Sequence, residues 1–391
     1  MKICVFAHVP PPMHGQAYMT QLLLQVLQEW RYKDSDAPEV FHVDARVSRK
    51  AQEIGGMQLG KLLRLGSYIL QAFWARVGER CTHLYYIPAP AKKSAILRDL
   101  LTLTVLRPFY PRLILHWHAM GLGLWVVGTT ALFPGFLEGW MRKRLRRLLA
   151  DADEAWILKR AFAEEVETFA PKKIRLLVNG IPDLFPDYDA RLAHRRERRA
   201  EQLRGMAEEG QPKGLVRFLH LGFGSRDKGI FLMLGFLRGW AQAYPLSTPI
   251  LKMCGTFASP EVEAEFREAS QGLQVEITGP VAGREKRACL EGADALLFFS
   301  QLPETMGLVV LEAMSAGLLP LVIQGKGVES ILEGTGLPAV DLNRAKEGVW
   351  QALRRYHPNQ LRALFLSRYS LPVFASEIRQ AIQELPHSTR A

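Results

Sequence analysis

The chain has 391 residues, of which 48% are hydrophobic and 23% are charged, and its formal net charge at pH 7 is +11. This length suits two ordinary domains, and the globular composition without low-complexity tracts excludes a disordered chain. The four cysteines are far apart and lack metal-ligand spacing, so we expect free buried thiols, a reducing compartment and no metal site; they are Cys4, Cys81, Cys254 and Cys289.

The first residues predict a buried strand rather than a secretory signal. Only five apolar residues, 3–7, follow Lys2, and a proline-rich loop comes directly after them. The loop contains Gly15, and a helix is predicted over 17–29. Strand, glycine-containing loop and helix are the opening of a Rossmann-like domain, in which the glycine admits a ligand close to the backbone or simply makes the turn. The GxGxxG fingerprint is absent, so no nicotinamide cofactor is expected.

The next 80 residues continue the alternation of helices and strands. The segment 60–77 reads as a very apolar helix, but Arg64 and Arg76 interrupt it, so it is too short and too charged to span a bilayer. The elements that follow are a strand at 83–87, a helix at 93–106 and a strand at 112–115.

The stretch 113–137 carries no formally charged residue, yet its glycines, histidines and Pro134 argue against a membrane span. We expect an apolar loop and a short helix there. Five basic residues lie within 142–147, directly after this stretch. Two readings stay open: a surface that attaches to anionic lipid, or a core helix with a charged outer face. Nucleic-acid binding is not expected, because no recognised module accompanies the basic residues.

Two histidines follow the strand at 112–115, where parallel sheets place their ligands. His118 is the candidate functional residue, and His116 is its competitor.

The second half repeats the strand–loop–helix pattern. A strand at 216–221 leads into a loop that begins at Gly222 and contains Lys228, which is placed to meet a diphosphate. Further strands are predicted at 250–254, ending at Gly255, and at 275–277.

The most informative stretch runs from Ser300 to Ile323 and predicts a loop, a helix over 307–316 with Gly317 as its left-handed cap, and a strand. Glu304 precedes the helix and Glu312 lies inside it. Backbone N–H groups at the helix start would offer a seat for a phosphate. Two carboxylates flanking such a seat would suit a nucleotide sugar, although two lone glutamates are more often surface residues.

The phrase from Pro303 to Gly317, Pro-Glu-x-x-Gly-Leu-x-x-x-Glu-Ala-Met-x-Ala-Gly, resembles the donor-site motif of the family 4 retaining glycosyltransferases. The resemblance is sharp over 216–335 and looser over 1–185. It implies the α/β GT-B fold, in which two Rossmann-like domains face each other across a cleft.

The same resemblance implies the domain organisation. An Asn-Gly turn at 179–180 resembles the end of the family's first domain, so residues 1–185 would form the acceptor-side domain. A basic linker at 186–210 and a donor domain at 211–370 would follow. The last segment, 371–391, would pack back on the first domain.

The resemblance also implies residue roles. Glu312 would hold ribose hydroxyls and Glu304 sugar hydroxyls, Lys228 would stabilise the departing diphosphate, and His118 would act on the acceptor side. Phe223 stands where the family commonly has a diphosphate-binding arginine, and Arg226 is a candidate substitute. The full donor-binding set is Gly15, Gly222, Arg226, Lys228, Gly255, Pro280, Glu304, Thr305, Met306, Gly307, Leu308 and Glu312.

We therefore expect a metal-independent hexosyltransferase without a cofactor, which uses a UDP or GDP sugar. Its acceptor would be a saccharide, lipid-linked in our reading, in cell-surface polysaccharide or lipopolysaccharide synthesis. The expected location is the cytoplasm, with attachment at the inner face of the plasma membrane as a candidate. The alternatives are a catalytically silent scaffold that binds nucleotide sugar or glycan, and a GT-B sugar-nucleotide epimerase.

Overall fold

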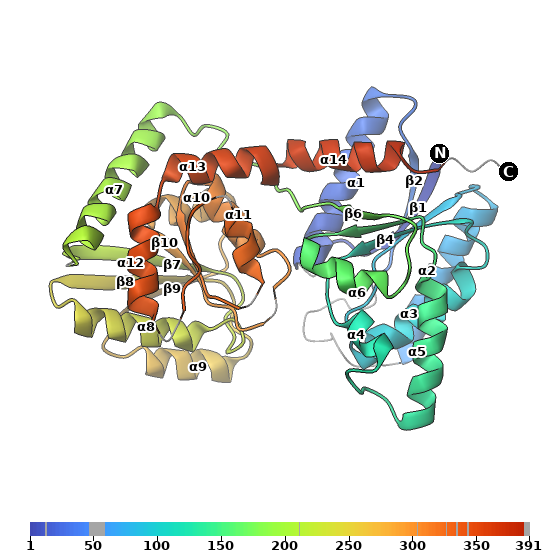
Figure 1. Ribbon diagram of the computed structural model, residues 1–391, viewed down its shortest axis with the longest axis horizontal. Coiled ribbons are helices and arrows are strands. Elements are labelled where there is room, and N and C mark those ends of the chain that lie inside the picture. The colour runs from blue at the N-terminus through green and yellow to red at the C-terminus, as the bar shows by residue number, and fades with distance from the viewer. Residues whose placement is uncertain are drawn as a thin grey trace. The chain divides into compact units, whose positions relative to one another are not determined.

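The computed structural model describes residues 1–11, 14–46, 59–210, 212–302, 304–325, 327–333, 335–341 and 344–386. The chain divides into two compact units, Met1–Asn179 with Phe374–Ala391, and Gly180–Val373 (Figure 1). Pro303 of the donor-site phrase and residues 387–391 of the last predicted segment lie outside the described residues.

Unit 1, Met1–Asn179 with Phe374–Ala391, is built on one parallel sheet with the strand order β2-β1-β3-β4-β5-β6. Most residues of its inner strands are buried, as in parallel sheets covered on both faces. The order reverses at β1, which pairs with β2 on one side and β3 on the other, and ligands of such sheets bind beside this reversal. The strands are β1 (Lys2–Ala7), β2 (Glu39–Asp44), β3 (His83–Tyr86), β4 (Arg112–Trp117), β5 (Glu154–Ile157) and β6 (Ile174–Leu176).

Three helices of unit 1, α2, α3 and α5, pack on the same face of this sheet. Leu65 and Ala72 of α2, Leu103 of α3 and Leu145 of α5 belong to one buried cluster with the strand residue Leu113. The helices of the unit are α1 (Gly15–Lys33), α2 (Leu59–Val77), α3 (Lys93–Leu106), α4 (Leu122–Val127), α5 (Gly135–Leu149), α6 (Ala163–Glu167) and most of α14 (Leu371–Gln383).

The start of α1 differs from the predicted residue 17. His14 takes the position before the first turn, and its Nδ1 accepts a hydrogen bond from the Ala17 N–H, so the helix begins at Gly15. The uncharged stretch 113–137 contains strand and the short helix α4, as expected. Among the described residues, no helix is both long and apolar enough to cross a membrane.

Unit 2, Gly180–Val373, also holds one parallel sheet, with the order β11-β10-β7-β8-β9. The reversal lies at β7, between β8 and β10. Its strands are β7 (Gly214–Leu221), β8 (Ser247–Cys254), β9 (Gln274–Gly279), β10 (Ala295–Phe298) and β11 (Leu319–Val322). Its helices are α7 (Ala190–Glu209), α8 (Ile230–Ala243), α9 (Pro260–Ala269), α10 (Gly283–Gly292), α11 (Leu308–Ser315), α12 (Ala345–Arg355) and α13 (Pro358–Leu364).

The predicted basic linker at 186–210 is instead almost entirely the helix α7. Asp189 caps its start by accepting from the Leu192 N–H, and Gly210 ends it with a φ of +69°. Its inner side buries Arg196, Ala200, Leu203 and Ala207, which recur at helical spacing. The run is therefore part of unit 2, because this inner side is buried while residues such as Arg195 and Arg198 lie on the exposed side.

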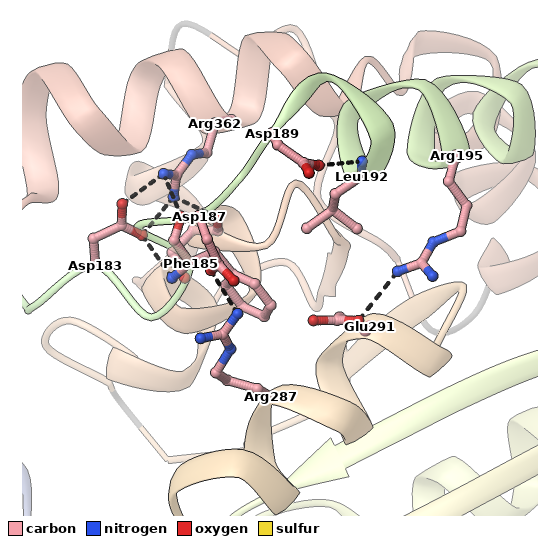
Figure 2. A network of polar contacts seen from close by, with 10 residues as sticks. Asp183, Phe185, Asp187, Asp189, Leu192, Arg195, Arg287, Glu291 and Arg362 are labelled. Atoms are coloured by element: carbon pink, nitrogen blue, oxygen red, sulfur yellow. Dashed lines mark hydrogen bonds and ion pairs between the residues drawn. The ribbon is translucent and has the colours of Figure 1, made fainter.

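The segment before α7 is also held within unit 2 (Figure 2). Arg362 forms two ion-paired hydrogen bonds of 2.5 Å with Asp183 and donates to the Phe185 carbonyl at 2.9 Å. Arg287 pairs with Asp187 at 2.6 Å. These contacts explain why the boundary between the units falls at 179–180 rather than at 185.

Candidate functional site

The predicted donor residues of unit 2 gather at the carboxyl ends of its strands. Gly222 follows β7, Gly255 follows β8, Pro280 follows β9, and the loop leading to Glu304 follows β10. Backbone hydrogen bonds join these strand ends: the Gly222 N–H donates to the Cys254 carbonyl at 2.9 Å, and the Gly255 N–H to the Gly279 carbonyl at 2.7 Å. The rim of the site is therefore made largely of main chain.

Two glycines in this rim cannot carry a side chain. Gly255 has a φ of +145°, and a Cβ added there would lie 1.7 Å from the Gly222 carbonyl oxygen. Gly229, which begins the turn into α8, has a φ of +75°, and its Cβ would lie 2.0 Å from the Phe299 oxygen. Both positions need glycine because the backbone conformation and the space exclude other residues.

Lys228 and Glu304, which are 76 residues apart in the sequence, form an ion pair. The Ser300 hydroxyl donates to the same Glu304 oxygen, Oε1, at 2.8 Å. Both charged side chains are largely shielded from solvent, so an anionic ligand would compete with Glu304 for the lysine at short range.

The start of α11 lies directly after Glu304. Gly307 precedes the helix in a left-handed conformation with a φ of +43°. Among the described residues, no protein group accepts a hydrogen bond from the backbone N–H groups of Thr305, Met306, Gly307 or Leu308. These donors, together with the positive end of the helix dipole, suit a phosphate group.

Glu312, on the second turn of α11, has one satisfied oxygen and one that is not. Its Oε1 accepts from the Lys286 ammonium of α10 at 2.9 Å. Its Oε2 is buried and has no hydrogen-bond partner among the described residues. A buried acceptor without a donor costs about 1–3 kcal/mol, so this oxygen marks a place where a ligand hydroxyl would be stabilising. Lys286 was missed by sequence reasoning, because no local pattern relates α10 to α11.

Arg226 does not join this group. Its guanidinium pairs with Glu265 of α9 and lies 4.7 Å from the centre of the Phe231 ring, and the side chain is 60% exposed. Arg226 therefore does not supply, beside Lys228, the second cation that the resemblance implies for the diphosphate.

In unit 1 the two candidate histidines have different surroundings. The His116 ring is fully enclosed: its Nδ1 lies 2.6 Å from the Tyr85 hydroxyl, and its ring packs against Trp156. His118 lies next to it, with ring centres 4.2 Å apart, and is 9% exposed. His116 thus has a packing role within β4. His118 follows the carboxyl end of this strand and remains the candidate functional residue.

Sequence reasoning missed two further histidines in this group. His8 follows β1, and its Nε2 lies 2.7 Å from the Nε2 of His14, the residue before Gly15 and α1. Burial lowers the pKa of His118 to about 3, with smaller contributions from His8 and His14. Burial likewise lowers the pKa of His8 to about 4. These rings are neutral at pH 7 and can act only as hydrogen-bonding groups there.

A separate cavity of about 400 Å³ lies in unit 2 at the amino end of β10, away from the strand ends that carry the predicted donor residues. Arginines of α7 line it together with Arg217, Glu291 and Asp294. Two of these arginines are compensated, since Arg195 pairs with Glu291 and Arg199 with Asp294.

Comparison with known proteins gives a family match in unit 2. Residues 237–356 match the family model described as glycosyl transferases group 1. None of the curated proteins compared with the chain matches it in sequence.

Solved structures match nearly the whole chain at low sequence identity. Sucrose-phosphate synthase from Thermosynechococcus elongatus is 17% identical with a TM-score of 0.64, over 98% of this chain and 99% of its own. HepE from Anabaena, solved in complex with UDP-glucose, is 14% identical with a TM-score of 0.58, over 98% and 100%. WaaG, a glycosyltransferase involved in lipopolysaccharide biosynthesis, is 13% identical with a TM-score of 0.60, over 99% and 100%.

At these identities the solved structures establish the fold, and they confirm the predicted GT-B architecture of two Rossmann-like domains. The family match covers the stretch that contains most of the predicted donor motif. Residues 237–356 therefore resemble the group 1 glycosyl transferases in sequence, and the chain as a whole has the GT-B fold.

Proposed function

We propose that the protein is a retaining glycosyltransferase that moves a hexose from a nucleoside-diphosphate sugar to a saccharide acceptor, without a metal or a cofactor. Two observations carry the proposal together: the ion pair of Lys228 with Glu304, directly before the open N–H groups at the start of α11, and the unsatisfied Glu312 oxygen on the same helix. HepE, a neighbour in fold, is described in complex with UDP-glucose, which supports a UDP sugar as the donor.

Each donor-site residue has a distinct task in this proposal. The Lys228 ammonium and the N–H groups of residues 305–308 stabilise the negative charge that develops on the departing diphosphate. Glu304 accepts hydrogen bonds from sugar hydroxyls once the diphosphate has drawn Lys228 towards itself. Glu312 Oε2, which lacks a donor, accepts from a ribose hydroxyl.

We assign the acceptor side to unit 1, with His118 as a neutral hydrogen-bonding group near the end of β4. A lipid-linked saccharide at the cytoplasmic face of the plasma membrane, used for cell-surface polysaccharide or lipopolysaccharide, is the acceptor we propose. The role of WaaG in lipopolysaccharide biosynthesis supports this class of product.

The first test is calorimetric titration of the protein with UDP and with GDP. We expect micromolar binding of one nucleotide and at least about tenfold weaker binding for Glu312→Ala, since a buried hydrogen bond to a charged group contributes about 1.5–3 kcal/mol. Glu276→Ala is the matched control, because Glu276 also pairs with a lysine, Lys252, at 2.9 Å, but outside this group. If neither nucleotide binds, the proposal loses its main support.

A catalytically silent scaffold is the second candidate, and two observations favour it. Phe223 occupies the position of the family's diphosphate-binding arginine, and Arg226 is engaged by Glu265. Nucleotide binding without acceptor-dependent release of UDP or GDP from the sugar nucleotide would identify the scaffold. Interconversion of free sugar nucleotides without any acceptor would identify an epimerase instead.

A further inference from the structure

The outer faces of three helices in unit 1 expose many large apolar side chains. On α2, Leu63, Leu70 and Trp74 are 70%, 68% and 61% exposed, and their spacing of seven and four residues places them in one stripe. We call the corresponding residues of all three helices the apolar face: Leu63, Leu70 and Trp74 of α2, Leu101 and Val105 of α3, and Phe136, Leu137 and Trp140 of α5.

These three helices are neighbours on one side of the unit 1 sheet (Figure 1). The Phe73 ring of α2 meets the edge of Phe109, which follows α3, with ring centres 4.9 Å apart. The Arg76 guanidinium donates to the Phe109 carbonyl at 2.8 Å. The outer stripes therefore belong to adjoining parts of one layer.

The apolar face is not needed to complete the core of unit 1. The inward residues of the same helices, such as Ala72, Leu103 and Leu145, are already fully buried against the sheet. Contiguous exposed apolar side chains beyond this core are unusual on a monomeric protein and mark a surface that another body covers.

The exposed charges on the three helices themselves have one sign. The three helices contain only two carboxylates, Asp99 of α3 and Glu138 of α5, and both are buried. The end of α5 carries four cations, and no carboxylate among the described residues lies within ion-pair distance of any of them; they are Lys143, Arg144, Arg146 and Arg147. Helices that expose apolar and basic side chains but no acid of their own form a surface complementary to anionic lipid.

We propose that the apolar face docks on a membrane surface that contains anionic phospholipid. The aromatic and aliphatic side chains enter the boundary between headgroups and acyl chains, and the cations of α5 contact lipid phosphates. The attachment is peripheral, since no helix of the described residues can span a bilayer. Such docking would place the protein where a lipid-linked acceptor is found. The observations that support it do not depend on the proposed transfer reaction.

The test is co-sedimentation of the full-length protein with phosphatidylcholine vesicles and with vesicles that also contain phosphatidylglycerol, without nucleotide or sugar. We expect preferential binding to the anionic vesicles that weakens as salt is added. Leu70→Glu should weaken this binding at least about tenfold, because it removes apolar burial and adds a negative charge. Arg146→Gln combined with Arg147→Gln should weaken it by about tenfold.

Leu246→Glu is the matched control, because Leu246 is 67% exposed on unit 2, where it is not part of the apolar face. It should bind anionic vesicles as the wild type does. Calorimetric binding of UDP or GDP, measured on the same variants, reports folding and the donor site separately, so failure of either proposal can be distinguished.

Three results would overturn the docking proposal. The first is equal or absent binding to neutral and anionic vesicles at low salt. The second is an equal loss of binding in Leu246→Glu. The third is a protein dimer that dissociates in Leu70→Glu without vesicle binding, which would show that a second copy covers this face.

Discussion

Glu304 Oε1 accepts hydrogen bonds from both Lys228 and Ser300, so at the scale of single residues the protein itself fixes the position of this carboxylate in the proposed donor site. The ion pair holds the Lys228 ammonium beside Glu304, directly before α11. In the proposed function, the same ammonium contacts the phosphate that binds at the start of this helix. Positioned charges of this kind are the usual source of large rate effects in group transfer, because they require little reorganisation during the reaction.

Lys228→Ala is expected to lower kcat/KM for transfer by about 10²- to 10³-fold, since a preorganised donor to a developing anion contributes roughly 2.7–4 kcal/mol. Initial rates of nucleotide release with a suitable acceptor measure this. Lys252→Ala, which removes the cation of another Lys–Glu pair of unit 2, should leave the rate nearly unchanged. Equal effects of the two substitutions would contradict the role of Lys228.

The buried histidines predict how stability depends on pH. Burial lowers the pKa of His118 to about 3 and that of His8 to about 4, below the ordinary value near 6.5. The unfolded chain therefore binds protons more readily between these values, so stability is fully present above about pH 6.5 and falls as the pH drops towards 4.

Thermal unfolding followed from pH 8 to pH 4.5 should show this loss, and His118→Gln should show a smaller drop in Tm than the wild type. The glutamine cannot take up a proton, so the part of the pH dependence that comes from position 118 disappears. A drop of the same size in His118→Gln would contradict the assignment.

At the scale of elements, much of the fold could be predicted from residue patterns. The helix α11 lies within one residue of its predicted bounds, and Gly317 has the predicted left-handed conformation, because each has a local signature. The helix α7 was missed since its arginines dominate the composition, although Asp189, Gly210 and the buried spacing of Arg196 and Ala200 were present in the sequence.

Contacts between elements could not be predicted in the same way. The pair Lys286–Glu312 joins α10 to α11, and Arg226 turns to Glu265 of α9 rather than to the diphosphate position. No local pattern fixes such partners, because they depend on how the helices pack and on which of several carboxylates lies nearest.

Arg196 gives a test at this scale. Its guanidinium is buried and donates to the Ala293 carbonyl at 2.8 Å and to the Leu290 carbonyl, both near the end of α10. Arg196→Met leaves those carbonyls without donors and should lower the free energy of unfolding by about 1–3 kcal/mol in denaturant titrations.

The neighbouring Arg195 is the control, because its pair with Glu291 is more exposed to solvent. Arg195→Met should change the free energy of unfolding by no more than about 1 kcal/mol. If Arg196→Met and Arg195→Met had the same free energy of unfolding, the buried Arg196 hydrogen bonds would not stabilise unit 2 as we infer.

At the scale of the whole molecule, the two units carry different surface chemistry. Unit 2 holds the carboxylates and the lysine of the proposed donor site, and unit 1 holds the neutral histidines and the apolar face. The sequence predicts two Rossmann-like domains through its resemblance to the glycosyltransferase family, and the repeated strand–loop–helix pattern agrees with it. The predicted first domain ends at residue 185, whereas the units divide between Asn179 and Gly180. No local sequence pattern shows that the segment after Gly180 is held in unit 2 by Arg362.

The main-chain rim of the donor site has a consequence for divergence. The hydrogen bonds from Gly222 to Cys254 and from Gly255 to Gly279 involve no side chain. Apart from the fixed glycines, the residues around the rim can therefore change without moving these backbone atoms. This agrees with chains that share only 14% or 17% of their residues with this one and keep the same fold.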